Sequence, residues 1–192
     1  MDDDHLSVPR NHDIVTIVVR DHEALATLLD SFSPVDPAQR GDLFWTLTNE
    51  LVRHEVAEEL VLYPAARRYG GPGAQPAEVG IEQQERVERL LADLDETDAS
   101  DSEFPDAWAA LTDAVKAHAA FEEEEILPLL VEHMTDVERF EAGDHYAQAK
   151  KRAPTHPHPQ GRLGTGSLMA VADRIRDAMH PDRPRSNRTA SP

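Results

Sequence analysis

An imidazole followed four residues later by a carboxylate occurs twice in this chain, in closely similar surroundings. One copy, HEVAEELVLYP, begins at His54, and the other, HAAFEEEEILP, begins at His118. Residues four apart lie on the same face of an α-helix. The spacing therefore predicts that His54 and Glu58 share one helix face and that His118 and Glu122 share another. Two such pairs inside a helix bundle would supply the ligands of a two-metal site.

The two carboxylates fall where apolar residues would otherwise pack. Glu58 and Glu122 continue stripes of apolar residues, and no Lys or Arg shares those stripes near them. Burying two ionised carboxylates without partners costs several kcal/mol each, whereas bound cations would balance their charge. Nitrogen and carboxylate ligands without thiolate favour iron, with manganese or zinc as alternatives. Glu59 and Glu123 lie one residue further round each helix, so we expect them to be solvated or to support the ligands from outside.

A third histidine, His22, lies in the middle of an apolar stripe near the N-terminus. Its neighbours on the stripe follow the alternating three- and four-residue spacing of one helix face. They are Val15, Val18, Leu25 and Leu29. A histidine on an apolar face is more often a hydrogen-bonded core residue than a metal ligand. The two carboxylates change this balance, so His22 joins the candidate ligands.

Four amphipathic segments with short connections predict an all-α protein, an antiparallel four-helix bundle. The predicted helices cover residues 13–32, 42–69, 78–94 and 107–133. Pro64 and Pro128 fall late in the second and fourth helices, and we expect them to kink or end those helices. Further helices over residues 135–153 and 168–179 would form a C-terminal helical extension that docks on the bundle.

The predicted organisation is one domain with flanking segments. It comprises a disordered N-terminus over residues 1–11, the bundle over 12–133, the extension over 134–180 and a disordered tail over 181–192. Cysteine is absent, which excludes disulfides, zinc–thiolate sites and iron–sulfur clusters. The acidic N-terminus has no signal-peptide pattern, and no apolar run approaches the roughly 20 residues that span a bilayer. We therefore expect a cytoplasmic protein without a membrane partner.

The formal net charge of −18 is unevenly distributed along the chain. Residues 1–149 hold 10 Lys/Arg against 34 Asp/Glu, a net charge of −24, whereas residues 150–192 carry +6. So acidic a body attracts cations and repels nucleic acid and anionic membranes, so we expect no nucleic-acid partner. The basic tail is expected to contact the acidic body or to serve a partner. Nothing in the pattern predicts the oligomeric state.

The two repeats, preceded by RDHEAL near the N-terminus, resemble the hemerythrin-like HHE cation-binding domain over about residues 12–133. The resemblance implies a four-helix bundle that holds a non-haem di-iron centre and binds O₂ or related small oxidants. It also implies that His22 and His54 are terminal ligands on one iron and that His118 is a ligand on the other. The bridging carboxylates would be Glu58 and Glu122. The segments KKRAPTHPHP and AVADRIRDAM resemble the tail of an actinobacterial-type subset of this family.

The chain departs from the family pattern on the third helix. The family usually places a histidine there, whereas this chain reads EQQERVERLL. Only the amides of Gln83 and Gln84 lie near the predicted apolar stripe of that helix. An amide oxygen is a poor iron ligand beside imidazole. The metal beside His118 is therefore short of a ligand from the four core helices.

Three explanations for this gap stay open. A side chain from elsewhere completes the shell, water fills the gap in an asymmetric centre, or only one metal binds well. The candidate side chains are Glu125, His145, Tyr146, His156 and His158. Glu125 belongs to a charge run typical of a solvated face, and the last two histidines lie in a proline-rich loop typical of a surface. His145 and Tyr146, on a predicted helix, rank above them.

Three functional hypotheses follow. The first is a di-iron protein that binds or senses O₂, peroxide or NO. The second is a di-iron enzyme with catalase-like or oxidase activity at the same site, because a more open centre favours turnover. The third is a metal-poor helical bundle that acts as an interaction module through its basic tail. The pattern does not decide whether the protein is an enzyme.

Overall fold

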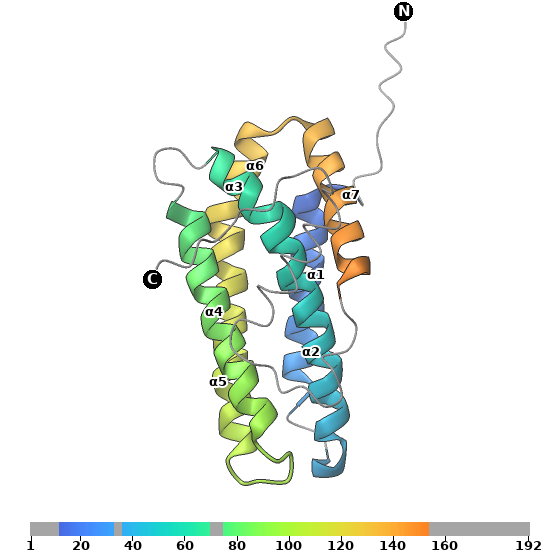
Figure 1. The fold of residues 1–192 in the computed structure, drawn as a ribbon, viewed down its shortest axis with the longest axis vertical. Helices are drawn as coiled ribbons and strands as arrows, with labels where there is room; N and C mark the ends of the chain where they lie inside the picture. The colour runs from blue at the N-terminus through green and yellow to red at the C-terminus, as the bar shows by residue number, and fades with distance from the viewer. Residues whose placement is uncertain (1–11, 33–35, 70–74, 154–192) are drawn as a thin grey trace, which may run out of the picture.

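The computed structural model of the 192-residue chain describes residues 12–32, 36–69 and 75–153. Within these ranges every regular element is helical, which confirms the predicted all-α fold (Figure 1). The helix predicted over residues 168–179, and with it His156 and His158, lies outside the described residues.

Four helical rods form the bundle, and two of them continue through a wider turn. The elements are α1 (Ile14–Asp30), the 3₁₀ turn η2 (Pro37–Gln39), α2 (Arg40–Ala57), the π-turn η3 (Glu58–Leu62), α3 (Tyr63–Tyr69), α4 (Gln75–Glu96), α5 (Phe104–Phe121), the π-turn η4 (Glu122–Ile126), α6 (Leu127–His133) and α7 (Asp136–Arg152). One rod joins α2, η3 and α3, and another joins α5, η4 and α6. The predicted segments differ from these bounds by a few residues at their ends. Helix α5, for example, begins three residues early because Pro105 suits a first helical turn.

A π-helical turn precedes each of the two repeat prolines, where a kink or an end was expected. Proline lacks an N–H group, and in a regular α-helix its ring collides with the carbonyl four residues earlier. Here the turn is wider: the N–H of Tyr63 bonds to the carbonyl of Glu58, and the N–H of Leu127 bonds to that of Glu122. Both helices therefore continue beyond their prolines.

Apolar side chains fill the bundle on both sides of one polar layer. The buried cluster on the side of α3 and α6 includes Ile14, Val18, Leu62, Ile126 and Leu130. The buried cluster on the other side includes Leu25, Leu51, Leu91, Leu111 and Val115. On their own helices, His22, His54 and His118 fall between these two sets. The predicted core stripes are therefore interrupted at one common depth.

Helix α7 confirms the predicted helical stretch after the bundle and packs against α1, α2 and η3. A capping box at Thr135 starts it. Ion pairs fasten α7 to α1, with Arg139 2.9 Å from Asp13 and Lys150 2.7 Å from Asp21. These ion pairs fix α7 beside α1, and its packing against α2 and η3 places it beside the rod that carries the first repeat.

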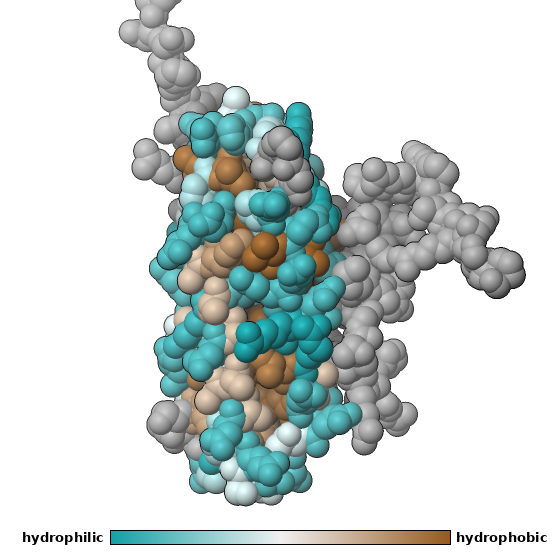
Figure 2. Space-filling model, turned by 90° about the vertical axis from the view of Figure 1, so that its left-hand side faces the viewer, coloured by the Kyte–Doolittle hydropathy of each residue, from teal (hydrophilic) through white to brown (hydrophobic). Residues whose placement is uncertain are grey.

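Hydrophilic residues cover most of the face drawn in Figure 2, with apolar patches between them. No described helix is long and apolar enough to cross a membrane. The bundle keeps most of its charged residues outside and its apolar residues between the helices. Buried histidine and glutamate side chains are therefore the exceptions that require an explanation.

Candidate metal centre

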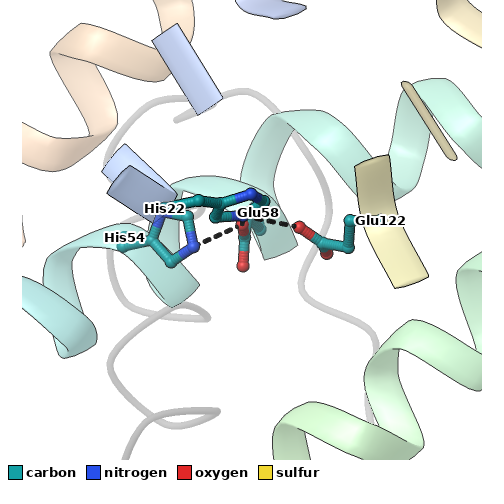
Figure 3. A group of neighbouring side chains, drawn as sticks. All are labelled: His22, His54, Glu58 and Glu122. Carbon is teal, nitrogen blue, oxygen red and sulfur yellow. Dashed lines mark ion pairs between the residues drawn. The ribbon is translucent and has the colours of Figure 1, made fainter. Parts of the chain in front are cut away.

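Five buried polar side chains meet in the layer between the two apolar clusters. Helix α1 provides His22, the junction of α2 and η3 provides His54 and Glu58, and the junction of α5 and η4 provides His118 and Glu122. None of the five is more than 5% exposed. Figure 3 shows His22, His54, Glu58 and Glu122 converging, with His54 and Glu58 on one rod and the other two on different helices. The structure thus brings both H-x-x-x-E pairs, and the histidine of the first helix, to one place.

Two histidines share one side of the layer. The Nε2 atom of His54 lies 2.7 Å from Glu58 Oε1, and that of His22 lies 3.7 Å from the same oxygen and 3.3 Å from Glu122 Oε2. One potential ligand atom from each of these four residues lies within 4.8 Å of the others. Two imidazoles and two carboxylate oxygens therefore surround one position that a cation could occupy.

The imidazole of His118 faces the opposite oxygens of the same carboxylates. Its Nε2 atom lies 3.8 Å from Glu58 Oε2 and 3.7 Å from Glu122 Oε1. The hydroxyl of Tyr63 is on this side too: it donates to Glu122 Oε1 at 2.8 Å and lies 3.4 Å from His118 Nε2. Each carboxylate thus turns one oxygen to the paired histidines and the other to His118. Two metal positions bridged by carboxylates require this arrangement.

Several polar atoms of the layer lack a hydrogen-bond partner among the described residues. They are His22 Nε2, both carboxylate oxygens of Glu58 and Oε2 of Glu122. Buried polar atoms in proteins are almost always paired, and an unpaired buried carboxylate is costly. Cations between these atoms would satisfy all of them. Imidazole nitrogen together with carboxylate oxygen fits iron, so the residues present suit the metal that the family resemblance implies.

Protons balance the charge of the metal-free layer. Burial lowers the pKa of His22, but the carboxylates of Glu122 and Glu58 outweigh it and raise that pKa from 6.5 to about 10. The pKa of His54 is raised as well, because Glu58 and Asp21 outweigh the effect of burial. Burial would raise the pKa of Glu58, yet the three histidines lower it well below its usual value. Since metal ligation needs neutral imidazole, metal binding must displace protons from this layer.

The ring nitrogens that face away from the carboxylates have partners of their own. The Nδ1 atom of His22 lies 2.8 Å from a carboxylate oxygen of Glu123, and that of His118 lies 3.4 Å from the amide oxygen of Gln83. Such outer contacts fix the orientation and tautomer of metal-ligating histidines. Glu123 was expected either to be solvated or to support a ligand, and it supports His22. The amide of Gln83 is the outer partner of His118.

The outer partner of His54 comes from helix α7. The hydroxyl of Tyr146 lies 2.8 Å from His54 Nδ1 and donates to Asp21 at 3.2 Å. Lys150 pairs with the same carboxylate. Tyr146, which ranked among the candidate ligands, therefore lies on the far side of the imidazole from Glu58. Helix α7, which lies outside the four-helix bundle, therefore orients His54 through the hydroxyl of Tyr146.

A known family accounts for this geometry. The model of the hemerythrin HHE cation binding domain matches residues 13–130, which is more than half of the chain. The chain belongs to the hemerythrin HHE cation-binding family. It is similar to an uncharacterized hemerythrin-like protein of Schizosaccharomyces pombe, with 29% identity over 174 residues that cover 84% of each chain. The resemblance inferred from the repeats is confirmed.

A second protein similar to this HHE chain is a DNA nickase of Nostoc sp. (strain PCC 7120), with 26% identity over 152 residues. The match covers 79% of this chain but 41% of the nickase, so the chain spans less than half of that relative. No solved structure gives a significant match. The resemblance of the tail to an actinobacterial-type subset stays a prediction.

The further candidate ligands differ in whether they are buried near the polar layer or exposed. Glu125 and His145 are exposed, unlike the buried layer. Gln84 is 1% exposed, and both polar atoms of its amide lack a hydrogen-bond partner among the described residues. Tyr63 was not among the predicted site residues, because a residue five positions after Glu58 leaves the shared face of a regular helix. The proline that follows Tyr63 was the available signal for a wider turn.

A small cavity of about 20 Å³ lies beside the layer. The three histidines line it together with apolar side chains that include Leu25, Leu51 and Val115. A buried water needs about 10–15 Å³ of such volume, so the cavity has room for one ligand of a few atoms. Apart from the histidines, Lys116 is the polar residue that lines the cavity, and the remaining walls are apolar.

Replacing Tyr146 with phenylalanine is expected to weaken metal binding without unfolding this HHE protein. The substitution removes the hydroxyl beside His54 Nδ1 and keeps the buried ring. Loss of such an outer partner typically costs about 10–100-fold in metal affinity. Competition with a chelator measures the change, and Tyr69→Phe is the matched control because Tyr69 is half-buried and stacks on His133. Equal affinities of Tyr146→Phe and wild type would contradict the supporting role.

Proposed function

We propose that this is a non-haem di-iron protein that binds and responds to a small oxidant, which is O₂, peroxide or NO. One observation carries the proposal: Glu58 and Glu122 each turn one oxygen to the paired histidines and the other to His118. Carboxylates shared in this way support two metal positions, each with at least one imidazole. When bound, a ferrous pair would supply electrons and open coordination positions for such a ligand.

The chain's own residues prepare the layer for this role. Apolar clusters on both sides exclude bulk water, which strengthens the electrostatic interactions inside. The outer contacts of the three histidines hold their Nε2 atoms toward the carboxylates. The cavity beside them leaves room for a ligand of a few atoms. Iron suits this donor set, and manganese or zinc would be held by the same atoms.

A di-iron enzyme with catalase-like or oxidase activity is the second candidate. The side of the layer that contains His118 has one imidazole, where the other side has two. A metal position with fewer protein ligands leaves more room for peroxide or O₂ to exchange, which favours turnover. The metal-poor interaction module is disfavoured, because it would keep a layer of charged histidines and carboxylates buried in the apolar core without a metal, at a cost in desolvation.

The similarity to the nickase does not lead us to propose DNA cleavage for this chain. The match covers less than half of that protein. Residues 1–149, which include every described helix except the end of α7, carry a net charge of −24 and would repel a phosphate backbone.

Anaerobic loading with Fe²⁺, followed by separate exposure to O₂, NO and H₂O₂, tests the proposed function. We expect about two iron ions per chain, as in other carboxylate-bridged bundles, and a changed absorption spectrum with at least one oxidant. The control is Glu124→Ala, which removes an exposed carboxylate from the second repeat. Iron far below one per chain, or a loaded protein that responds to none of the three oxidants, would refute the proposal. Repeated consumption of H₂O₂ with release of O₂ would favour the enzyme.

A further inference from the structure

The face of α4 next to the layer carries a glycine and a glutamine instead of a histidine. Gly80 and Gln84 are buried and four residues apart, so they share one helix face. A Cβ atom added to Gly80 would lie 2.9 Å from Cε1 of Tyr63 and 3.3 Å from Cδ1 of Ile126. The first of these distances is one that real Cβ atoms essentially never show. The ring of Tyr63 thus occupies the space that a side chain at position 80 would need.

The π-turn η3 directs Tyr63 into this space. On a regular helix, five steps of about 100° would leave Tyr63 about 140° away from Glu58. In η3 the N–H of Tyr63 bonds to the carbonyl of Glu58, so the two residues are about one wide turn apart. Tyr63 therefore lies on nearly the same face as Glu58, with 1% of its surface exposed.

The hydroxyl of Tyr63 ends among the atoms that form the second metal position. It lies 2.8 Å from Glu122 Oε1 and 3.4 Å from His118 Nε2, and His118 in turn faces Glu58 Oε2. We propose that Tyr63 is a phenolate ligand of the metal held by His118, Glu58 and Glu122, and that it takes the place of the histidine missing from α4. The inference rests on the proposed di-iron function.

The two repeats differ at this position in the way that the assignment requires. The residue that closes the π-turn is Tyr63 in the first repeat and Leu127 in the second. Leu127 lies in the apolar cluster. The side of the layer with two histidines needs no further donor, whereas the side with one histidine has a hydroxyl. The repeat with a tyrosine at this position therefore directs a hydroxyl to the side that has one histidine, and the repeat with a leucine adds no donor to the side that has two.

Phenolate is a hard, anionic oxygen donor, so it stabilises Fe³⁺ more than Fe²⁺. Ligation replaces the phenolic O–H bond with an O–Fe bond, and the proton leaves to solvent with those displaced from the histidines. The two irons would therefore be inequivalent. The iron beside Tyr63 would be the harder one to reduce.

Absorption and resonance Raman spectra of the iron-loaded, oxidised full chain test the assignment. Phenolate bound to Fe³⁺ gives a visible charge-transfer band, and excitation in that band enhances the ring vibrations of the bound phenolate. We expect wild type to show both signals and Tyr63→Phe to lose both while it keeps the iron held by the paired histidines. Tyr69→Phe is the control, and Tyr146→Phe loaded to saturation should also keep the signals, because its hydroxyl lies behind His54.

Three outcomes would overturn the assignment. They are a loaded wild type without phenolate vibrations, a Tyr63→Phe protein that retains them, and loss of the signals in Tyr69→Phe. Circular dichroism of each variant separates loss of the ligand from unfolding. Gly80→Ala is an independent check, because its Cβ must displace the ring of Tyr63. An unchanged band in folded Gly80→Ala would also count against the assignment.

The same samples distinguish this inference from the proposed function. If wild type binds no iron, the di-iron function fails and the ligand assignment fails with it. If wild type binds iron and responds to an oxidant but shows no phenolate vibrations, the ligand assignment alone fails.

Discussion

Replacing Glu58 with alanine is expected to abolish binding of the proposed iron pair. Glu58 is the carboxylate that the Nε2 atoms of His54, His22 and His118 face, at 2.7, 3.7 and 3.8 Å. Its removal takes one oxygen from each metal position. Removal of an outer partner of a ligand already costs about 10–100-fold in affinity, so loss of a shared ligand is expected to cost more than roughly 100-fold.

Metal analysis after loading, together with an absorption spectrum, measures this effect. Glu122→Ala should behave like Glu58→Ala, because Glu122 also faces both sides of the layer. The control is Glu124→Ala, which removes the same charge from an exposed position two residues further on. Wild-type iron content in either Glu58→Ala or Glu122→Ala, with native helicity, would show that the ligand set is wrong.

The metal-free protein is expected to lose stability as the pH rises from 6.5 towards about 10. The pKa of the His22 imidazole is about 10 in the folded protein, against an ordinary value of 6.5. A raised histidine pKa contributes its full stability below the unfolded value, and this contribution is lost as the pH rises through the folded value. Because one pKa unit corresponds to about 1.36 kcal/mol, the loss amounts to several kcal/mol.

Two buried carboxyl groups act in the same direction. Burial and neighbouring carboxylates raise the pKa of Glu55 well above its usual value and also raise that of Glu122. An acid with a raised folded pKa is stabilising while protonated, and this stability too is lost as the pH rises. The decline in the metal-free protein is therefore not confined to the titration of His22.

Thermal unfolding of the metal-free and metal-loaded protein across this pH interval measures the effect. The melting temperature of the metal-free protein should fall, whereas that of the loaded protein should change less, because ligated imidazoles are already neutral. His22→Gln should flatten the metal-free profile, since it removes the group with the raised pKa. A metal-free melting temperature that is constant or rises across the interval would contradict the charge balance described for this layer.

The helices and the depth of the polar layer could be predicted from local periodicity. Apolar residues recur every three or four positions in each rod, and a polar residue that interrupts such a stripe must lie at the core. His22, His54 and His118 interrupt their stripes in this way, and Glu58 and Glu122 follow one turn later. Periodicity of this kind reflects backbone geometry alone, so one sequence is sufficient to detect it.

The remaining parts of the site depend on contacts that periodicity does not encode. The place of Tyr63 depends on a turn that departs from the regular helix. The contact of Tyr146 with His54 joins residues 92 positions apart and depends on how α7 docks. Gln83 and Gln84 both lie near the stripe of α4, and only packing shows that Gln84 is the buried one while Gln83 contacts His118.

Each π-turn contains one residue more than a regular helical turn of the same height. The helix therefore accommodates one additional residue without forming a loop. The two halves of each rod, before and after the turn, keep the phase that a shorter, regular helix would give them. Deleting one residue within η3 would therefore leave both halves packed and would keep Tyr63 at the layer, because it would then follow Glu58 by four residues on the same face of a regular helix.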